Sequence, residues 1–367
     1  MKTLAYLLIV VFLFSCSDSA DENPAPQPKD DDPTLYFPPI NGSEWATMTV
    51  AEAGWDQTKI NELIALAGDN SSRALLILKD GKLVVEAYFG KEFNGTTNFN
   101  ANSNWYWASA GKTLTATLVG LAVKENYLAL NDKSSEYLGN GWTSLTATDE
   151  QKITVLNQLT MTSGLDDGVA NSDCTLPSCL QFKAAASTRW AYHNAPYTLL
   201  DKVLENASGK NLNTYLNETL ELKIGLTGQF IQTGDNNVYY STARSMARFG
   251  LFLLAKGKWN NEQILDETYF TSMTNTSQNI NLSYGYLTWL NGKSSYRIPG
   301  SQINFSGSVS PNAPTDMFAA IGKNGQYINV VPSNNIVLIR MGDSPDQSLV
   351  PFLFQDDLWA VFKEAIN

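Results

Sequence analysis

The stretch "SRALLILKDGKLVVEAYFG", residues 72–90, decides the fold class. Two apolar runs flank Asp80-Gly81, and an Asp-Gly pair between such runs is a strong signal for a two-residue β-hairpin turn. Matching strand patterns stand near the carboxyl end, in "DMFAAIG" (316–322), "QYINVVP" (326–332) and "NIVLIRMG" (335–342). The sequence therefore predicts antiparallel strands at both ends of one domain.

Helical patterns fill the middle of the chain. Apolar residues recur at helical spacing in "TLTATLVGLAVKEN" (113–126), "APYTLLDKVLENASG" (195–209), "STARSMARFGLFLLAKG" (241–257) and the closing segment 349–367. In the third of these, Arg244 and Arg248 are expected on the solvated face. Strands, a long helical middle, strands and a last helix indicate an α+β fold, an antiparallel β-sheet flanked by helices with a mostly helical insertion.

Composition narrows the function classes. The chain has 367 residues, of which 43% are hydrophobic, enough to build a substantial core. The net charge is −11, and residues 18–32 supply −5 of it through six acidic residues and one lysine. No cluster of Lys and Arg suggests a nucleic-acid partner. We therefore expect a mildly acidic folded domain that binds no nucleic acid.

The first sixteen residues indicate export. Lys2 precedes the apolar run "LAYLLIVVFLF" (4–14), which is too short to span a bilayer comfortably and is typical of a signal peptide. The residues up to Cys16, "LFSC", resemble a bacterial lipobox, which implies lipidation of Cys16 and a lipid anchor in the cell envelope, at the outer membrane and facing the periplasm or the surface. The alternative is an ordinary signal peptide with an incidental cysteine. We predict a signal peptide (1–15), an acidic Pro-rich tether (16–45) and one folded domain (46–367).

Two further cysteines, Cys174 and Cys179, stand close together in "NSDCTLPSCLQF" (171–182). In an exported protein such a pair predicts a small disulfide loop. A zinc site is the alternative, but two thiols without a nearby histidine make a poor one. We expect neither a metal nor a cofactor.

One serine and one lysine stand three residues apart where a helical pattern begins, in "WYWASAGKTLTATLVGLAV" (105–123). A serine hydroxyl needs a base, and a lysine can serve if burial and positive potential lower its pKa from about 10.4. The i, i+3 spacing puts both side chains on one helix face, and the positive helix end favours the alkoxide and the neutral amine. We predict Ser109 as nucleophile and Lys112 as base. The alternatives are a helix-starting serine with a surface lysine, and a Ser-His-Asp site that recruits His193, the single histidine.

The segment "RWAYHNAPYTLLDKVLENASG" (189–209) supplies a third group. Tyr192 lies at a turn before a helix that Asn194 is placed to cap. A tyrosine fixed there can present its phenol to a neighbouring site, and an adjacent ammonium would lower its pKa, so that it could pass a proton to a leaving group. Y-x-N also occurs at 215–217 and 327–329, where a packed helix and a strand explain the tyrosine.

The order of the motifs resembles a known family. S-x-x-K is followed by "LTMTSGL" (159–165), by Y-x-N 83 residues after the serine (192 − 109), and by "STARSMARFGLFLL" (241–254), "SYGYLTWL" (283–290) and "AAIGKNGQYINVVP" (319–332). This series is similar to the serine hydrolases of the β-lactamase and penicillin-binding protein superfamily, especially the class C β-lactamase-like branch with carboxylesterases and 6-aminohexanoate-oligomer hydrolases. The resemblance covers about residue 46 to the end.

The resemblance implies a role for each site residue. Ser109 is the acylated nucleophile, Lys112 its general base and Tyr192 the proton shuttle. Asn194 supports the lysine or the substrate, and His193 is expected behind the site or at its rim.

The third motif of the family is not preserved. Relatives carry a Lys-Thr-Gly triplet on the strand beside the site, and Lys323-Asn324-Gly325 looks similar. Aligned on the following strand, however, these residues fall at a hairpin turn, which Asn-Gly favours. In this alignment the position of the triplet corresponds to residues 317–319. We expect the strand end at 321–323, and Lys323 in particular, to offer a backbone N–H beside that of Ser109 as an oxyanion hole.

A serine hydrolase that forms an acyl-enzyme and cleaves an ester or amide outside the cytoplasm is the leading functional hypothesis. A D-amino-acid peptidase and a β-lactamase of the same fold are alternatives, and a non-catalytic cell-wall-binding lipoprotein is the rival from another class. Trp107, Tyr284 and Trp289 are expected as walls of the substrate pocket. The substrate is a small molecule or peptide, and the protein is expected to be monomeric.

Overall fold

The hairpin at Asp80-Gly81 forms as predicted in the computed structural model, which describes residues 35–366. Strand β1 (Ser72–Lys79) pairs with β2 (Lys82–Tyr88) in antiparallel register. Asp80 and Gly81 have φ of 51° and 81°, the left-handed values that a type I′ turn requires.

The predicted strands from both ends of the chain join in one sheet, which confirms the α+β fold class. Its order is β2-β1-β13-β12-β11-β8, with antiparallel neighbours throughout. The added strands are β8 (Trp289–Leu290), β11 (Phe318–Gly322), β12 (Gln326–Val331) and β13 (Ile336–Gly342). Every residue of β11, β12 and β13 is buried, because this part of the sheet is covered rather than open to water on one side.

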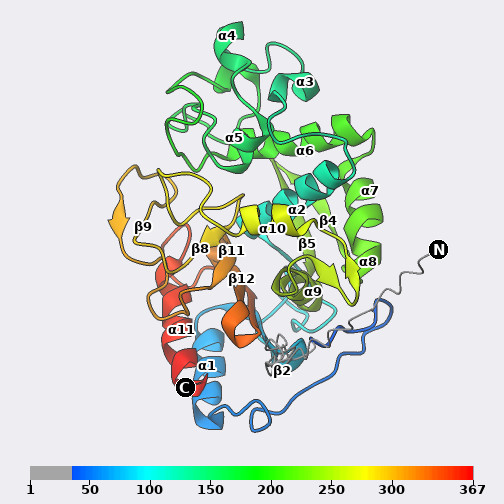
Figure 1. Cartoon of the computed structure of the whole chain (residues 1–367). Coiled ribbons are helices and arrows are strands. Elements are labelled where there is room, and N and C mark those ends of the chain that lie inside the picture. Colours follow the sequence, from blue (N-terminus) through cyan, green and yellow to red (C-terminus); the bar gives the residue numbers. More distant parts are fainter. Residues whose placement is uncertain (1–34, 367) are drawn as a thin grey trace, which may run out of the picture. The chain divides into compact units, whose positions relative to one another are not determined.

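Helices cover the sheet. Helix α9 packs on β1, β12 and β13, and α1 packs on β1 and lies beside α11 (Figure 1). Their bounds are α1 (Gln57–Asp69), α9 (Ala243–Leu254) and α11 (Phe352–Ile366). Gly250 of α9 meets the sheet so closely that a Cβ there would stand 2.5 Å from the Val337 side chain. The closing helix and the helix at 241–257 thus form where the periodicity predicts them.

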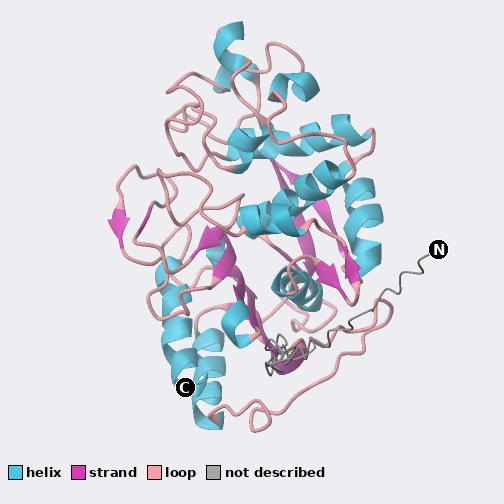
Figure 2. Ribbon diagram, viewed as in Figure 1, coloured by secondary structure: helices cyan, strands magenta, loops and turns pink. Residues whose placement is uncertain are grey.

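The helical middle of the chain forms the other part of the domain, around the central helix α2 (Figures 1 and 2). Its helices are α2 (Gly111–Lys124), α3 (Ser134–Leu138), α4 (Ala147–Glu150), α5 (Val155–Leu159), α6 (Asn194–Ser208), α7 (Leu212–Leu216), α8 (Leu222–Ile224) and α10 (Glu267–Met273). Short sheets add β3 (Asn104–Tyr106), β4 (Gly228–Thr233), β5 (Asn236–Thr242), β6 (Lys258–Trp259), β7 (Glu262–Gln263), β9 (Ser295–Tyr296) and β10 (Phe305–Ser306). Residues 111–122 of α2 are all buried, as expected for a helix enclosed on every side.

The domain begins earlier than the sequence predicts. Residues 35–45 were assigned to the tether, yet Tyr36 donates its N–H to the Asp80 carbonyl and the Trp45 indole donates to the Gly81 carbonyl. The tether prediction is therefore wrong for these eleven residues, because aromatic residues among the prolines give the segment apolar surface to bury.

Two arginines of α9 hold the same segment, and neither is a solvated helix residue as expected. Arg248 is buried and donates to the Pro39 carbonyl. Arg244 forms a two-pronged ion pair with Glu86 at 2.6 and 2.7 Å and donates to the Ser43 carbonyl. Bidentate pairing of this kind is geometrically specific, so both arginines act as structural anchors.

The predicted signal peptide, Cys16 and the tether up to residue 34 lie outside the described residues. Among residues 35–366, none of the helices is long and apolar enough to cross a membrane.

Candidate active site

Ser109 lies at the junction between the small sheet and the central helix. Strand β3 leads through Trp107 into a 3₁₀ turn, Ala108–Ala110, and then directly into α2. Trp107 fixes this junction, because its N–H donates to the Tyr239 carbonyl and its indole donates to Ser241 Oγ, both at 2.8 Å. Ala108 has φ of 47°, an uncommon conformation for a residue with a Cβ, which residues beside functional sites often adopt.

Trp107 is therefore a support and not a pocket wall. The side chain is fully buried and packs edge-on against Tyr239. Successive side chains of a strand point to opposite faces, so Trp105 and Trp107 both turn into the core while Tyr106 between them is partly exposed. The prediction that Trp107 lines the substrate pocket is wrong.

Lys112 stands directly beside Ser109. Its Nζ is 3.1 Å from Ser109 Oγ, as the i, i+3 spacing predicts. Lys112 is 3% exposed, whereas Ser109 is partly open to solvent. Within residues 35–366 the amine has no carboxylate at ion-pair distance; aromatic rings surround it, with the Tyr197 ring centre at 4.1 Å and the Tyr192 ring centre at 5.1 Å.

Burial lowers the pKa of Lys112 to about 7, and the charges of Asp173 and Asp201 oppose the shift. Removal from water disfavours the ammonium form, and neither acid is close enough to restore it. At neutral pH a large fraction of Lys112 is consequently a free amine, able to accept the hydroxyl proton of Ser109.

Tyr192 reaches the same point from the loop before α6. The loop is held where Ala191 donates its N–H to the Met161 carbonyl at 3.0 Å, within the "LTMTSGL" segment, which forms a buried turn. Burial raises the pKa of Tyr192, with a smaller opposing effect from a hydrogen bond to Ser109. The predicted lowering by a neighbouring ammonium is wrong, because the neighbouring lysine is itself desolvated. Tyr192 is thus a protonated phenol, a proton donor.

Tyr284 and Trp289 hold Tyr192 in place. The Trp289 ring stacks on Tyr192 with centres 5.9 Å apart, and Tyr284 meets both rings edge-on. Both residues are buried, at 0% and 3% exposure, so neither is the open pocket wall that the sequence predicts. Their aromatic packing instead restricts the orientation of the phenol.

Asn194 differs from its predicted place, whereas His193 lies behind the site, one of the two places predicted for it. Helix α6 begins at Asn194 with His193 at the N-cap position, so Asn194 does not cap it. The Asn194 amide donates to Asp173 at 2.7 Å instead, and so orients a carboxylate that acts on Lys112. His193 is 2% exposed, burial lowers its pKa, and within the described residues its ring forms no hydrogen bond to Ser109 or any other group. It is a buried neighbour of Tyr192 and not a rim residue.

Strand β11 closes the site on the other side of Ser109. Gly322 lies against the 3₁₀ turn so tightly that a Cβ would stand 2.5 Å from the Trp107 carbonyl and 3.0 Å from the Ser109 nitrogen. Only glycine fits there. Lys323, predicted as a backbone donor, is the exposed first residue of the turn 323–325, and the hairpin predicted at Asn324-Gly325 is present.

The edge of β11 has a free backbone position near this contact. Asn291 donates to the Met317 carbonyl, so the odd-numbered residues of β11 direct their backbone groups toward β8. Strand β8 pairs only with Phe318 and Ala319. The N–H of Ile321, two residues further on, therefore faces the same edge beyond the end of β8.

A disulfide joins Cys174 and Cys179 in the loop that carries Asp173. The loop is attached to the helical part at Asn194 and, through Asn171 and Asp235, to the turn between β4 and β5. Asp173 therefore lies on a segment tied at several points.

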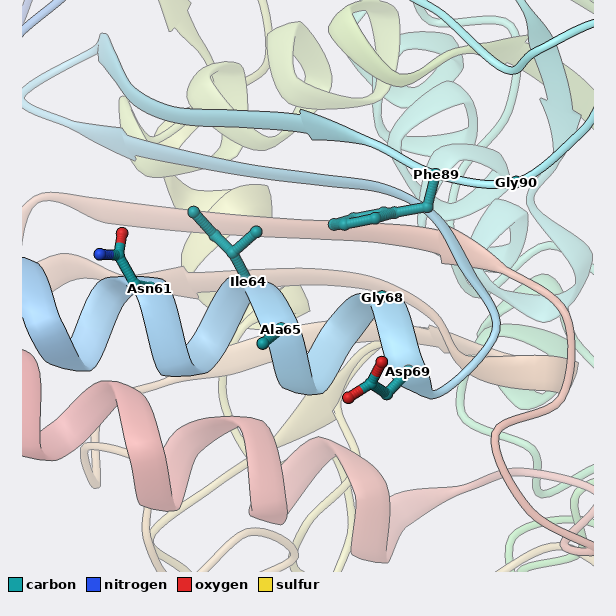
Figure 3. Close-up of a pocket in the computed structure, with 7 residues that line it drawn as sticks. All are labelled: Asn61, Ile64, Ala65, Gly68, Asp69, Phe89 and Gly90. Atoms are coloured by element: carbon teal, nitrogen blue, oxygen red, sulfur yellow. The ribbon is translucent and has the colours of Figure 1, made fainter.

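One surface hollow, with a volume of about 590 Å³, lies between α1 and the end of β2 (Figure 3). It is lined by Asn61, Ile64, Ala65, Gly68, Asp69, Phe89 and Gly90. This lining holds no nucleophile beside a base.

The Beta-lactamase family matches residues 60–347 of the chain. The chain belongs to the β-lactamase family. It is 23% identical over 317 residues to an uncharacterized protein of Alkalihalophilus pseudofirmus, and the aligned region covers 78% of this chain and 87% of the relative.

Solved structures share the fold of this β-lactamase-family protein. A Bacillus anthracis protein described as a 6-aminohexanoate-dimer hydrolase has a TM-score of 0.65 at 18% identity, covering 90% of this chain and 89% of its own. A protein of Bacteroides dorei described as a β-lactamase has a TM-score of 0.64 at 16% identity, and the match covers 85% of this chain and 99% of its own. A penicillin-binding protein homolog of Caulobacter crescentus has a TM-score of 0.63 at 13% identity, and the match covers 84% of this chain and 96% of its own. The fold is thus that of a family of serine hydrolases.

Sequence reasoning missed Tyr197, Asp201 and Gly322 of this β-lactamase-family site. A signal existed for Asp201, which follows Tyr197 by four residues on the buried face of α6, together with Leu200 and Leu204. A lone acid among apolar residues at helical spacing marks a buried carboxyl group.

Proposed function

We propose that the protein is a serine hydrolase that cleaves an ester or amide through an acyl-enzyme on Ser109. The observation that carries the proposal is the 3.1 Å approach of a buried, desolvated Lys112 amine to a partly exposed Ser109 hydroxyl. A base with pKa near the working pH is the most effective general catalyst.

The steps follow from the positions of the groups. Lys112 accepts the Ser109 proton as the oxygen attacks the carbonyl, and the N–H groups of Ser109 and Ile321 bind the oxyanion. Tyr192 donates its proton to the leaving group and regains one from Lys112. Water then attacks the acyl-enzyme, with the same groups returning the proton to Ser109.

The substrate class follows from what β11 lacks. By the predicted alignment, Met317, Phe318 and Ala319 take the place of the family's Lys-Thr-Gly triplet, and the structure buries all three of these uncharged residues. No cation of this segment is available to bind a substrate carboxylate. This supports an ester or amide without a carboxylate beside the scissile bond over a β-lactam. We further propose that Cys16 carries lipid and anchors the enzyme at the outer membrane.

A covalent probe tests the proposal. A fluorophosphonate should label the wild-type protein, and peptide mass spectrometry should place the adduct on Ser109; the Ser109→Ala variant should stay unlabelled. A panel of p-nitrophenyl esters, D-alanyl peptides and a chromogenic cephalosporin should then show turnover of the esters first. Absence of an adduct on Ser109 would overturn the proposal, and preferential turnover of the cephalosporin would overturn the substrate class.

A further inference from the structure

Tyr197 on α6 lies closer to the amine of Lys112 than Tyr192 does, yet it has no part in the steps proposed above. Its ring centre is 4.1 Å from Lys112 Nζ, against 5.1 Å for the Tyr192 ring. Such a distance is within the range of a cation–π contact, in which the negative face of the ring attracts an ammonium group. The structure thus sets an aromatic face against the group that gains a charge during acylation.

The hydroxyl of Tyr197 does not explain this placement. Its oxygen is 3.4 Å from Thr115 Oγ1, a long contact for two hydroxyl groups. Tyr197 is 5% exposed, so that a weakly bonded hydroxyl is buried with it. The close contact of this side chain is the one between its ring and the amine.

Few charged groups compete with the ring for the amine. Within residues 35–366, no carboxylate lies at ion-pair distance from Lys112, and two acids act on it from further away, Asp173 and Asp201. Asn194 donates a hydrogen bond to Asp173, and burial raises the pKa of Asp201 to about 8, so that at neutral pH most of Asp201 is uncharged. The groups nearest to a charge on Lys112 are therefore the Ser109 hydroxyl and the two rings.

The elements packed against α2 add little to this set. Strand β11 and the turn 108–110 carry no charged side chain. The other acids on these elements are paired, hydrogen-bonded or exposed: Glu205 with Lys202, Glu218 with Lys210, Glu221 with the Tyr239 hydroxyl, and Glu267 in solvent.

We propose that Tyr197 is a positioning residue whose ring stabilises the ammonium form of Lys112 that arises as Ser109 attacks its substrate. The proposal rests on the function proposed above. In that step the O–H bond of Ser109 breaks, an N–H bond forms at Lys112 Nζ, and the serine oxygen bonds to the carbonyl carbon, whose electron pair moves to the carbonyl oxygen. The charge grows beside the ring as the proton moves, so the ring favours the transition state over the ground state.

Burial and the ring act on the amine in opposite directions. Burial disfavours the ammonium form and lowers the pKa of Lys112 to about 7. The ring favours the ammonium form, and its loss should make Lys112 give up its proton at lower pH and accept one less readily.

The test replaces Tyr197 with phenylalanine and then with trifluorophenylalanine, introduced at a suppressed stop codon. Fluorine withdraws negative charge from the ring face and leaves the shape of the ring nearly unchanged. The burst rate with p-nitrophenyl acetate is measured from pH 5 to 9. Phenylalanine keeps the ring, so the midpoint of the acid limb should stay close to that of the wild type, whereas trifluorophenylalanine should lower it by about one pH unit.

The plateau of the burst rate gives a second signature. Above the midpoint, the trifluorophenylalanine protein should acylate about threefold more slowly, because the amine is a weaker base. Its profile should therefore cross that of the phenylalanine variant at about pH 6 to 7, faster below the crossing and slower above it. A merely structural loss would lower the whole curve and leave its midpoint in place.

Tyr197→Leu tests the same point with a natural residue. It removes the ring, so the midpoint should again move down. The matched control is Tyr269→Leu, which removes another buried tyrosine packed on α2; the Tyr269 hydroxyl donates to the Ala116 carbonyl at 2.7 Å. Because this ring supports the helix backbone and not the amine, its loss should leave the midpoint unchanged.

The outcomes separate the two proposals. A wild type that forms no acyl-enzyme on Ser109 overturns the function itself. A wild type that acylates normally, with the same midpoint in the phenylalanine and trifluorophenylalanine proteins, overturns only the role of the Tyr197 ring. An upward shift in Tyr197→Leu does the same, because it would show that the ring only keeps water from the amine.

Discussion

Two buried cations of this protein, Lys112 and Arg340, lie in contrasting surroundings. Arg340 on β13 is fully buried, and its guanidinium donates to Ser72 Oγ and to the carbonyls of Asn70, Asn324, Gly325 and Asp343 at 2.7–2.9 Å. Lys112, at 3% exposure, has one hydroxyl neighbour and two aromatic rings.

The contrast shows that burial alone does not make a base. Burial lowers the pKa of both groups, to about 10 for Arg340 and about 7 for Lys112. Arg340 stays charged because five acceptors replace its lost water, and it joins β1, β13 and the turn after β11. Lys112 lacks such acceptors, so the neutral amine dominates as the pH rises past 7. Replacement of lost hydration separates a buried cation that stays charged from a buried amine that becomes neutral near pH 7.

The largest expected effect is at the nucleophile and its base. Ser109→Ala should abolish acylation, and Lys112→Arg should be nearly as damaging, because a guanidinium keeps its proton at pH 7. Burst amplitudes with p-nitrophenyl acetate measure both. A normal burst from Lys112→Arg would show that the desolvated amine is not the base.

Tyr192→Phe should lower turnover by about 10² to 10⁴, the usual size of a general acid-base contribution. Its folding should change little, since the ring stays stacked on Trp289. Steady-state kinetics on esters with leaving groups of different pKa provide the measurement. The loss should be greatest for the poorest leaving group; a uniform loss would assign the phenol a merely structural role.

Arg340→Met tests the structural role of Arg340. The substitution leaves five buried acceptors without their donor, so the free energy of unfolding should fall by about 3 to 5 kcal/mol. Urea unfolding measures the change. The folded fraction should keep acylation with an unchanged acid limb, and a shifted limb would contradict the division between the two cations.

Lys112→Met should have the opposite sign and stabilise the protein. The folded pKa of Lys112 is lowered, so below pH 7 both folded and unfolded chains carry the proton and the burial cost is complete. Between pH 7 and about 10 the unfolded chain alone binds it, and wild-type stability recovers as pH rises. The gain from Lys112→Met should therefore be largest below pH 7, about 2 to 4 kcal/mol, and fade toward pH 10. Unfolding midpoints of both proteins, measured across this pH range, test the prediction. A gain in stability that does not depend on pH would point to packing alone.

Local patterns predicted much of this structure. Ser109 and Lys112 meet because i, i+3 contact is fixed by the helix itself, and the hairpin at Asp80-Gly81 follows from its own two residues. Gly322 and Tyr197 could not be assigned functions in this way, because their partners lie on segments remote in sequence. The sequence predicts Trp107 as a pocket wall, although the alternation of side chains along β3 indicates that this residue points inward. The predicted tether is too long, because the prolines of this segment received more weight than the apolar surface of Tyr36 and Trp45.

The pH dependence of acylation shows whether a neutral Lys112 is the base. In the wild type the burst rate should rise with pH through a midpoint near 7, as Lys112 loses its proton. His193→Ala should keep that limb. A flat wild-type profile, or a limb that disappears in His193→Ala while Lys112→Arg still acylates, would contradict the account.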